Sequence, residues 1–400
     1  MPLDRFQKRE NITQVLKHIK IVLLYLMIQS TYKIEKILDI RRMYIVKIIH
    51  TADIHLGSKM DSRFSKEIAN ERKAELRNTF KRLVEYAKDN DVTVIMLCGD
   101  VFDSDRPFKK DKDFFYSVVA GNPDIDFLYL KGNHDISDAI PEESPENLKL
   151  FSEQWTTYSY GDVVICGTEI CPANSSSYYS SLGLDKEKHN IVMLHGQIND
   201  SLSGEDINLK KLKNKNIDYL ALGHIHKPSQ GRIDERGEYV YCGCLEGRGF
   251  DEPGEHGFVL LNIDGGKLEH KFIPFSKRKI NQTDVDITGC KSAYEAYIKV
   301  KTSVQFSKRD LYRINLIGDI NFDVDRLSED VEKFLADSCY FISVKDKTSR
   351  RIDISQYEND LSVKGEFIRT VYAKAELNNE EKMTIINCGL KALDGKEIEL

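Results

Sequence analysis

The chain has 400 residues, 41% of them hydrophobic, which is enough to bury a core in each of about two or three domains. Its formal net charge is −6, which excludes a generally polycationic protein, so binding of nucleic acid would require a local positive patch or bound metal. The eight cysteines include no CxxC pair, so we expect a cytoplasmic protein without a disulfide framework.

The amino-terminal stretch differs in composition from the rest of the chain. Residues 1–43 contain nine Lys/Arg but only four Asp/Glu. Their longest apolar run, 21–28, is far shorter than the roughly 20 residues that span a bilayer, and no small-residue cleavage site follows it. We therefore expect residues 1–42 to be a dispensable leader, with a surface amphipathic helix as the alternative. No membrane-spanning segment is predicted elsewhere, so we expect no membrane partner.

From residue 44 to about residue 275, short apolar runs alternate with helix-like stretches, which is typical of an α/β layer fold. Residues 65–88 have the periodicity of an amphipathic helix, with Leu76, Phe80 and Leu83 on its apolar face. Five of the apolar runs end in polar side chains that can bind a metal. Because ligands bind beyond the carboxyl ends of strands in such sheets, we expect these side chains to meet in one crevice.

The side chains at the five strand exits form a mixed set of oxygen and nitrogen ligands. This set is too large for one ion and suits two, with one carboxylate bridging them. Calcium is disfavoured because it requires an all-oxygen shell, whereas manganese, iron and zinc accept imidazole. The predicted metal ligands are Asp53, His55, Asp100, Asn133, His195, His224 and His226.

One histidine at the strand exits is not needed as a ligand. His134 follows Asn133 directly, so we expect its imidazole to face the substrate. We assign it to the leaving oxygen, either as general acid or as stabiliser of the developing charge. Asp103, three residues after Asp100, is predicted to orient this imidazole and to favour its protonated form. His134 and Asp103 are therefore the predicted catalytic pair.

The five motifs, in order, resemble those of the calcineurin-like metallophosphoesterases. They are Asp-x-His, Gly-Asp-x-x-Asp, Gly-Asn-His-Asp, His-Gly and Gly-His-x-His, and they span residues 53–226. Within that superfamily, the stretches HTADIHLGS, CGDVFDSDRPF, LKGNHD and LGHIHKP look most like those of SbcD-type DNA repair nucleases. The resemblance implies a four-layer αββα sandwich with two metals, of which manganese is favoured and magnesium, iron and zinc are alternatives.

The same resemblance implies roles for individual residues. The ligands of one metal would be Asp53, His55, Asp100 and His226, and those of the other would be Asp100, Asn133, His195 and His224. His134 matches the catalytic histidine of the family. SbcD-type nucleases typically cut DNA from 3′ to 5′ as exonucleases and cut hairpins or single strands as endonucleases. They also pair with an SbcC-like coiled-coil ATPase. They usually form homodimers, and the helix at 65–88 is a candidate dimer surface, with core packing as the alternative.

One departure from the phosphatase pattern bears on the substrate. Phosphatases of this superfamily carry an arginine after the second motif that clamps a phosphomonoester, but here Asp103 is followed by Ser104 and Asp105. The sequence therefore favours a diester substrate. A basic loop comes next, and its phosphate contacts would give affinity that does not depend on base sequence. The predicted DNA-binding residues in this loop are Arg106, Lys109 and Lys110, with Lys112 nearby.

The carboxyl-terminal third is predicted to add two smaller parts to the nuclease domain at 43–275. Residues 283–352 alternate strand and helix and match a small α+β capping domain in size. Their basic residues favour a DNA contact or a solvated charged face equally, because acidic residues are interleaved. Residues 355–400 carry helical apolar stripes and are predicted to form a helical tail, for which packing within the core is the default role. The resemblance implies that an SbcC-like ATPase binds this tail.

The sequence favours a metal-dependent DNA exonuclease of double-strand-break repair over two alternatives. The first alternative is a phosphodiesterase for a small substrate such as a cyclic nucleotide, which has less use for the additional domains and the basic loop. The second is a catalytically quiet scaffold for DNA or the ATPase, which has no use for His134 beside seven ligands.

Overall fold

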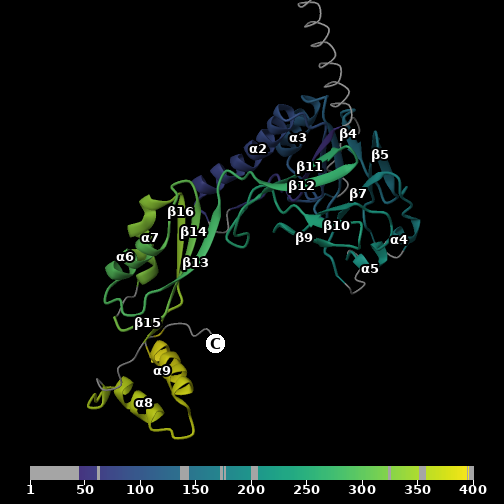
Figure 1. Ribbon diagram of the computed structural model, residues 1–400. Helices are drawn as coiled ribbons and strands as arrows, with labels where there is room; N and C mark the ends of the chain where they lie inside the picture. The colour runs from purple at the N-terminus through teal and green to yellow at the C-terminus, as the bar shows by residue number, and fades with distance from the viewer. Residues whose placement is uncertain are drawn as a thin grey trace, which may run out of the picture. The chain divides into compact units, whose positions relative to one another are not determined.

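The structure of the protein is a computed structural model that describes residues 45–60, 64–135, 144–171, 174, 177–199, 206–322, 326–350, 357–393 and 395 (Figure 1). The predicted leader, residues 1–42, lies outside the described residues. The chain divides into two compact units. The first unit comprises the chain up to Glu246 together with His256–Lys277. The second unit comprises Gly247–Glu255 together with the chain from Arg278 onward.

The first unit contains two six-stranded sheets. The first sheet has the order β12-β11-β1-β2-β3-β4, in which β1 to β4 are parallel and β11 and β12 are antiparallel to their neighbours. Its central strands are uninterrupted apolar runs because both faces of the sheet are covered. Its strands are β1 (Val46–Thr51), β2 (Val94–Cys98), β3 (Asp126–Leu130), β4 (Leu148–Leu150), β11 (Gly257–Asp264) and β12 (Lys267–Pro274).

The second sheet has the order β5-β6-β7-β8-β10-β9. Its four inner strands are parallel, and an antiparallel strand closes each edge. Its strands are β5 (Thr156–Tyr160), β6 (Val163–Gly167), β7 (His189–His195), β8 (Tyr219–Gly223), β9 (Ser229–Arg232) and β10 (Glu238–Tyr241).

The two sheets pack face to face, and helices cover their outer faces. Met96 and Leu128 of the first sheet share a buried cluster with Met193 and Ala221 of the second. Figure 1 shows α2 (Lys66–Asp89) and α3 (Lys109–Ala120) on one side, and α4 (Tyr178–Ser181) and α5 (Leu209–Leu212) on the other. Since apolar contacts fill each of the three interfaces, the predicted αββα sandwich is confirmed.

The long helix α2 follows the predicted amphipathic pattern. The Ser65 hydroxyl accepts a hydrogen bond from the Ile68 N–H at 3.4 Å and caps its first turn. Leu76, Phe80 and Leu83 are buried, as the periodicity predicts. Phe80 stacks on Phe115 of α3 with ring centroids 5.7 Å apart, so that the two helices share one core with the first sheet.

The second unit contains a three-stranded parallel sheet formed by β13 (Ile280–Asp286), β14 (Leu311–Ile317) and β16 (Phe341–Asp346). Helices α6 (Ala293–Ser303) and α7 (Leu327–Leu335) contribute Val300 and Val331 to its core. Two short strands, β15 (Asp319–Ile320) and β17 (Ser349–Arg350), form a separate pair, and a short 3₁₀ turn, η2 (Ala336–Ser338), follows α7. The strand and helix order within 283–352 is therefore the one expected from the sequence.

The last described part of the chain is a helical pair. Helices α8 (Val363–Tyr372) and α9 (Asn379–Leu393) pack on each other through Ile368, Val371 and Ile386. The limits 43–275, 283–352 and 355–400 stay predictions as domain boundaries. The loop Gly247–Glu255 belongs to the second unit, which a single boundary near residue 275 does not anticipate. Among the described helices, none is both long and apolar enough to cross a bilayer.

Candidate active site

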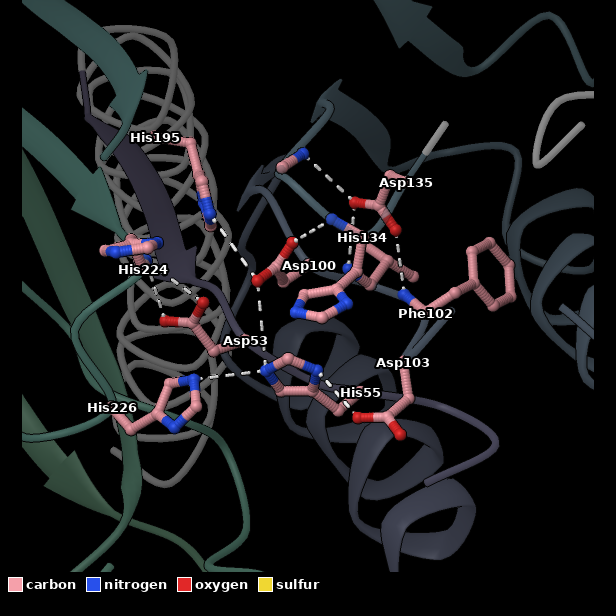
Figure 2. A network of polar contacts seen from close by, with 12 residues as sticks. Asp53, His55, Asp100, Phe102, Asp103, His134, Asp135, His195, His224 and His226 are labelled. Carbon is pink, nitrogen blue, oxygen red and sulfur yellow. Dashed lines mark hydrogen bonds and ion pairs between the residues drawn. The ribbon is translucent and has the colours of Figure 1, made fainter. Parts of the chain in front are cut away.

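The predicted site residues gather where the parallel strands of the first unit end (Figure 2). Asp53 and His55 follow β1, Asp100 follows β2, His195 ends β7, and His224 follows β8. The exits of β1 and β2 are joined by backbone hydrogen bonds, because the Asp53 N–H donates to Gly99 O and the His55 N–H donates to Asp100 O, both at 3.0 Å. The second sheet reaches the same place, because the His224 N–H donates to the Asp53 carboxylate and His195 Nδ1 lies 2.8 Å from Cys98 O.

Four of these residues have left-handed backbone conformations. The φ angle is 50° at Asp53, 51° at His55, 51° at Asp100 and 94° at His224. Residues other than glycine rarely adopt such angles, and each costs on the order of 1–3 kcal/mol that the surrounding structure must offset. The backbone leaves its strand abruptly at each position, which turns the side chains into the crevice instead of across the sheet.

Two glycines permit the close approach of the strand exits. Gly99 has a φ angle of +88°, and a Cβ atom there would overlap the His195 imidazole. A Cβ atom on Gly132 would overlap both the carboxylate and the backbone nitrogen of Asp100. The space beside both site residues is therefore available only because a glycine stands at each of these positions.

A first ligand cluster comprises Asp53, His55 and His226. One donor atom from each of these residues lies within 4.8 Å of the others. The Nε2 atoms of His55 and His226 face each other at 3.1 Å, and the rings cross nearly edge to face. Two imidazole nitrogens and a buried carboxylate that converge in this way can coordinate one divalent cation.

A second ligand cluster shares Asp53 and adds Asp100 and His195, again with donor atoms within 4.8 Å of one another. His195 Nδ1 lies 2.8 Å from the carbonyl oxygen of Cys98, to which its N–H can donate, so that Nε2 is the nitrogen that would bind a metal after losing its proton. Nε2 lies 3.5 Å from Asp100 Oδ2. It is buried, and no described residue provides it with a hydrogen-bond partner.

The electrostatics of the crevice agree with its use as a cation site. Burial raises the pKa of Asp53, and the nearby imidazoles oppose this shift. Although burial disfavours its ionised form, the His195 imidazole and the His134 N–H hold the pKa of Asp100 below its usual range. Burial likewise opposes protonation of His195, but the two carboxylates raise its pKa to about 9. A bound divalent cation would displace that proton.

The donor set therefore fits two divalent cations. Two carboxylates, Asp53 and Asp100, are 1% and 3% exposed, and an orphaned imidazole nitrogen faces one of them. His224 lies at the same edge, because its N–H donates to both oxygens of Asp53 at 3.0 and 3.1 Å and its ring centroid is 5.3 Å from that of His195. The metal-ligand roles of His224 and of Asn133, which is exposed in the turn after β3, stay predictions.

His134 lies at the open side of the crevice. Its backbone N–H donates to Asp100 Oδ1 at 3.0 Å, and its exposed ring lies 5.5 Å, centroid to centroid, from the ring of His55. Figure 2 shows its imidazole between Asp100 and His55. A side chain in this place can meet a substrate oxygen that approaches from solvent, and the catalytic role of His134 stays a prediction.

Sequence reasoning missed two contacts in this crevice. Asp103 Oδ1 lies 3.1 Å from Nδ1 of His55, whereas Asp103 was predicted to orient His134, and that pairing stays a prediction. Asp135 is buried, and its carboxylate accepts hydrogen bonds from the N–H groups of Val101, Phe102 and Gly132. It thereby fastens the turn after β3 to the turn after β2. The Gly-Asn-His-Asp motif contained Asp135, but only the fold shows what its carboxylate binds.

The predicted basic loop lies on the surface at the start of α3. Arg106, Lys109 and Lys110 are exposed. Lys109 Nζ forms an ion pair with Asp113 at 2.7 Å, and Lys110 Nζ lies 5.6 Å from the ring centroid of Phe108. The loop therefore offers cations to solvent, with the charge of Lys109 partly balanced by Asp113, and its phosphate contacts stay a prediction.

Residues 46–228 match the family of calcineurin-like phosphoesterases. An uncharacterized metallophosphoesterase of Bacillus subtilis, YhaO, is 28% identical over 65% of this chain and 67% of its own length. The DNA double-strand break repair protein Mre11 of Methanopyrus kandleri is 26% identical over 57% of this chain, and that of Sulfolobus acidocaldarius is 22% identical over 70%. The chain spans 56% of the Methanopyrus protein and 78% of the Sulfolobus protein.

Solved structures also resemble the chain. TT1561 of Thermus thermophilus has a TM-score of 0.39 at 14% identity and covers 57% of this chain and 99% of its own. A dimetal phosphatase from Danio rerio has a TM-score of 0.40 at 10% identity and covers 57% of this chain and 96% of its own.

Proposed function

Because this chain contains a calcineurin-like metallophosphoesterase domain, we propose that it is a two-metal phosphodiesterase that cuts DNA. The observation that carries the proposal is the pair of ligand clusters that share Asp53, with the His134 imidazole beside them at the open side of the crevice. The curated relatives named DNA double-strand break repair proteins support DNA as the substrate.

The metal site uses the seven residues at the strand exits. The first cation would be held by Asp53, His55, Asp100 and His226, and the second by Asp100, Asn133, His195 and His224, as the resemblance implies. Donor atoms of Asp53, His55 and His226 lie within 4.8 Å of one another, and so do those of Asp53, Asp100 and His195. Manganese is favoured because the shell mixes imidazole with oxygen, and magnesium, iron and zinc are the alternatives. Such cations, when bound, supply Lewis-acid activation of water and of the phosphoryl oxygens.

The chain's own side chains provide the remaining chemistry. His134 donates a proton to the leaving 3′ oxygen or stabilises its negative charge, because its ring is exposed beside the ligand clusters. Asp100 fixes the backbone at His134 through the 3.0 Å hydrogen bond. Ser104 and Asp105 stand in exposed positions where a phosphatase arginine would clamp a monoester, which favours a diester. Arg106, Lys109 and Lys110 contact the flanking phosphates.

The finer biological role rests on the resemblance to SbcD-type nucleases. We infer a 3′ to 5′ exonuclease for double-strand ends that also cuts hairpins or single strands during double-strand-break repair. An SbcC-like ATPase would dock on the helical segment 355–400, where Leu361 and Val363 are exposed. We further infer a cytoplasmic homodimer.

The first experiment measures manganese-dependent degradation of end-labelled duplex and hairpin DNA by the full chain. His134→Ala is compared with the native chain at matched metal loading, and His189→Ala, at the opposite end of β7 from His195, is the control. We expect His134→Ala to lower the rate about 10²–10⁴-fold, as for loss of a general acid, while His189→Ala keeps it.

The other outcomes of this experiment separate the alternatives. Hydrolysis of a small bis-ester that depends on His134, without DNA degradation even when an SbcC-like ATPase is supplied, would replace the proposal with a small-substrate phosphodiesterase. Metal and DNA binding without hydrolysis of either substrate would indicate a catalytically quiet scaffold.

A further inference from the structure

Phe108 is an exposed aromatic residue five residues after Asp103, at the start of α3. Its side chain is 62% exposed, and it is the one large hydrophobic side chain exposed among the described residues of the first unit. A single exposed apolar residue is ordinary in itself. Two features make Phe108 informative: its short distance along the chain from Asp103, and its position as the N-cap of α3.

The loop that carries Phe108 is anchored to the site on both sides. Five residues before it, Asp103 lies 3.1 Å from Nδ1 of His55, and five residues of chain reach at most about 18 Å. Three residues after it, the buried Asp111 accepts hydrogen bonds from Arg77 at 2.6 and 2.9 Å. Asp111 also abuts Gly57, two residues after His55, because a Cβ there would lie 3.1 Å from Asp111 Oδ2.

Phe108 also occupies a position that favours a different type of residue. It is the N-cap of α3, and its carbonyl oxygen accepts hydrogen bonds from the N–H groups of Asp111 and Lys112 at 2.9 and 3.1 Å. Its side chain makes no cap hydrogen bond, whereas Ser, Thr, Asp or Asn at such a position usually stabilises the helix. The backbone here is thus held firmly while the ring remains in solvent. Local helix stability does not explain the phenylalanine.

The surroundings of the ring indicate a ligand class. Arg106, Lys109 and Lys110 are exposed beside it, and Lys110 Nζ lies 5.6 Å from the ring centroid. Exposed aromatic rings among basic side chains are the combination that binds single nucleic-acid strands, because bases stack on the ring and phosphates meet the cations. We propose that Phe108 stacks on a base of the strand whose phosphodiester enters the crevice. This inference rests on the proposed function and makes unpaired, base-bearing strands the preferred substrates.

The test measures binding of a single-stranded oligonucleotide that contains 2-aminopurine, by the full chain in a His134→Ala background that slows cleavage. Phe108→Ala should weaken binding about tenfold and reduce the fluorescence response, whereas Phe108→Trp should restore both. Phe108→Ala should leave the slope of log affinity against log salt unchanged. Lys110→Gln should instead reduce that slope by about one, because it removes a phosphate contact.

The outcomes distinguish this inference from the proposed function. If the native chain degrades DNA but Phe108→Ala binds the oligonucleotide as tightly as its parent, the stacking role is overturned and the nuclease stands. If Phe108→Ala converts a dimer to a monomer in sedimentation while DNA affinity is unchanged, the ring is a protein contact. Failure of every variant to bind the oligonucleotide would contradict both proposals.

Discussion

The carboxylate of Asp103 lies 3.1 Å from Nδ1 of His55, while Nε2 of the same ring faces Nε2 of His226 at 3.1 Å. The carboxylate and the ring nitrogen are close enough for an ion pair, although they are not aligned as a hydrogen bond. Carboxylates in this position fix the tautomer and orientation of a metal-binding imidazole and raise its basicity. The geometry thus gives Asp103 a role toward the first ligand cluster.

Asp103→Asn should therefore weaken binding of Mn²⁺ at the first cluster by about 10–100-fold. Titration of the metal-free full chain with Mn²⁺, followed by electron paramagnetic resonance, measures this directly. Asp105→Asn is the matched control, since it removes a carboxylate from the same exposed loop without touching His55. Equal affinities in the two variants would show that Asp103 does not support the metal site.

Gly132→Ala should disrupt the site because the new methyl group overlaps the carboxylate and backbone nitrogen of Asp100. We expect a loss of about 1–3 kcal/mol or more in the free energy of unfolding, together with reduced Mn²⁺ affinity. Gly183→Ala is the control, since no atom lies within 4 Å of a Cβ there. Chemical denaturation and metal titration of both variants test this, and an intact metal affinity in Gly132→Ala would contradict it.

Arg72→Met should destabilise the first unit strongly. Arg72 is fully buried on α2 and contacts the carboxylates of Glu75 and Glu246, the latter at 3.4 Å. Removing the guanidinium leaves two buried carboxylates with less compensation, which typically costs about 3–5 kcal/mol. Urea denaturation compares it with Lys81→Met, an exposed change on the same helix that should stay within about 0.5 kcal/mol. A loss below about 1 kcal/mol in Arg72→Met would refute the buried charge cluster.

His50 should make stability fall in mild acid. It is fully buried between Tyr219 Oη, at 2.9 Å, and Leu222 O, at 3.2 Å, and burial lowers its pKa to about 3. Below about pH 6.5 the unfolded chain binds a proton at this residue and the folded chain does not. The free energy of unfolding should therefore decrease by up to about 1.4 kcal/mol per pH unit between about pH 6.5 and pH 3.

Urea denaturation at pH 7.5 and pH 5.5 measures this contribution of His50. The decrease on acidification should be about 1 kcal/mol smaller in His50→Gln than in the native chain. His189→Gln, at a partly exposed position on β7, should keep the native decrease. Identical pH dependence in the native chain and His50→Gln would contradict the depressed pKa.

The α/β layer class and the identity of several residues that gather at the site follow from the local pattern of the sequence, whereas the four-layer sandwich follows from its resemblance to a known family. Parallel strands buried on both faces are continuous apolar runs, and ligands in such sheets bind beyond the carboxyl ends of the strands, so local pattern is sufficient for the layer class and for these residues. Asp53, Asp100 and His195 were predicted on these grounds, and their donor atoms lie within 4.8 Å of one another.

The contacts between groups within that crevice depend instead on the three-dimensional packing of the chain. Asp103 and His55 are far apart in sequence. Asp135 is likewise far from Val101 and Phe102, whose N–H groups donate hydrogen bonds to its carboxylate. Spacing along a chain cannot specify such contacts, because they depend on left-handed turns and on glycines that let separate strand exits approach. The same holds for Gly247–Glu255, whose membership in the second unit depends on long-range packing and has no local signal.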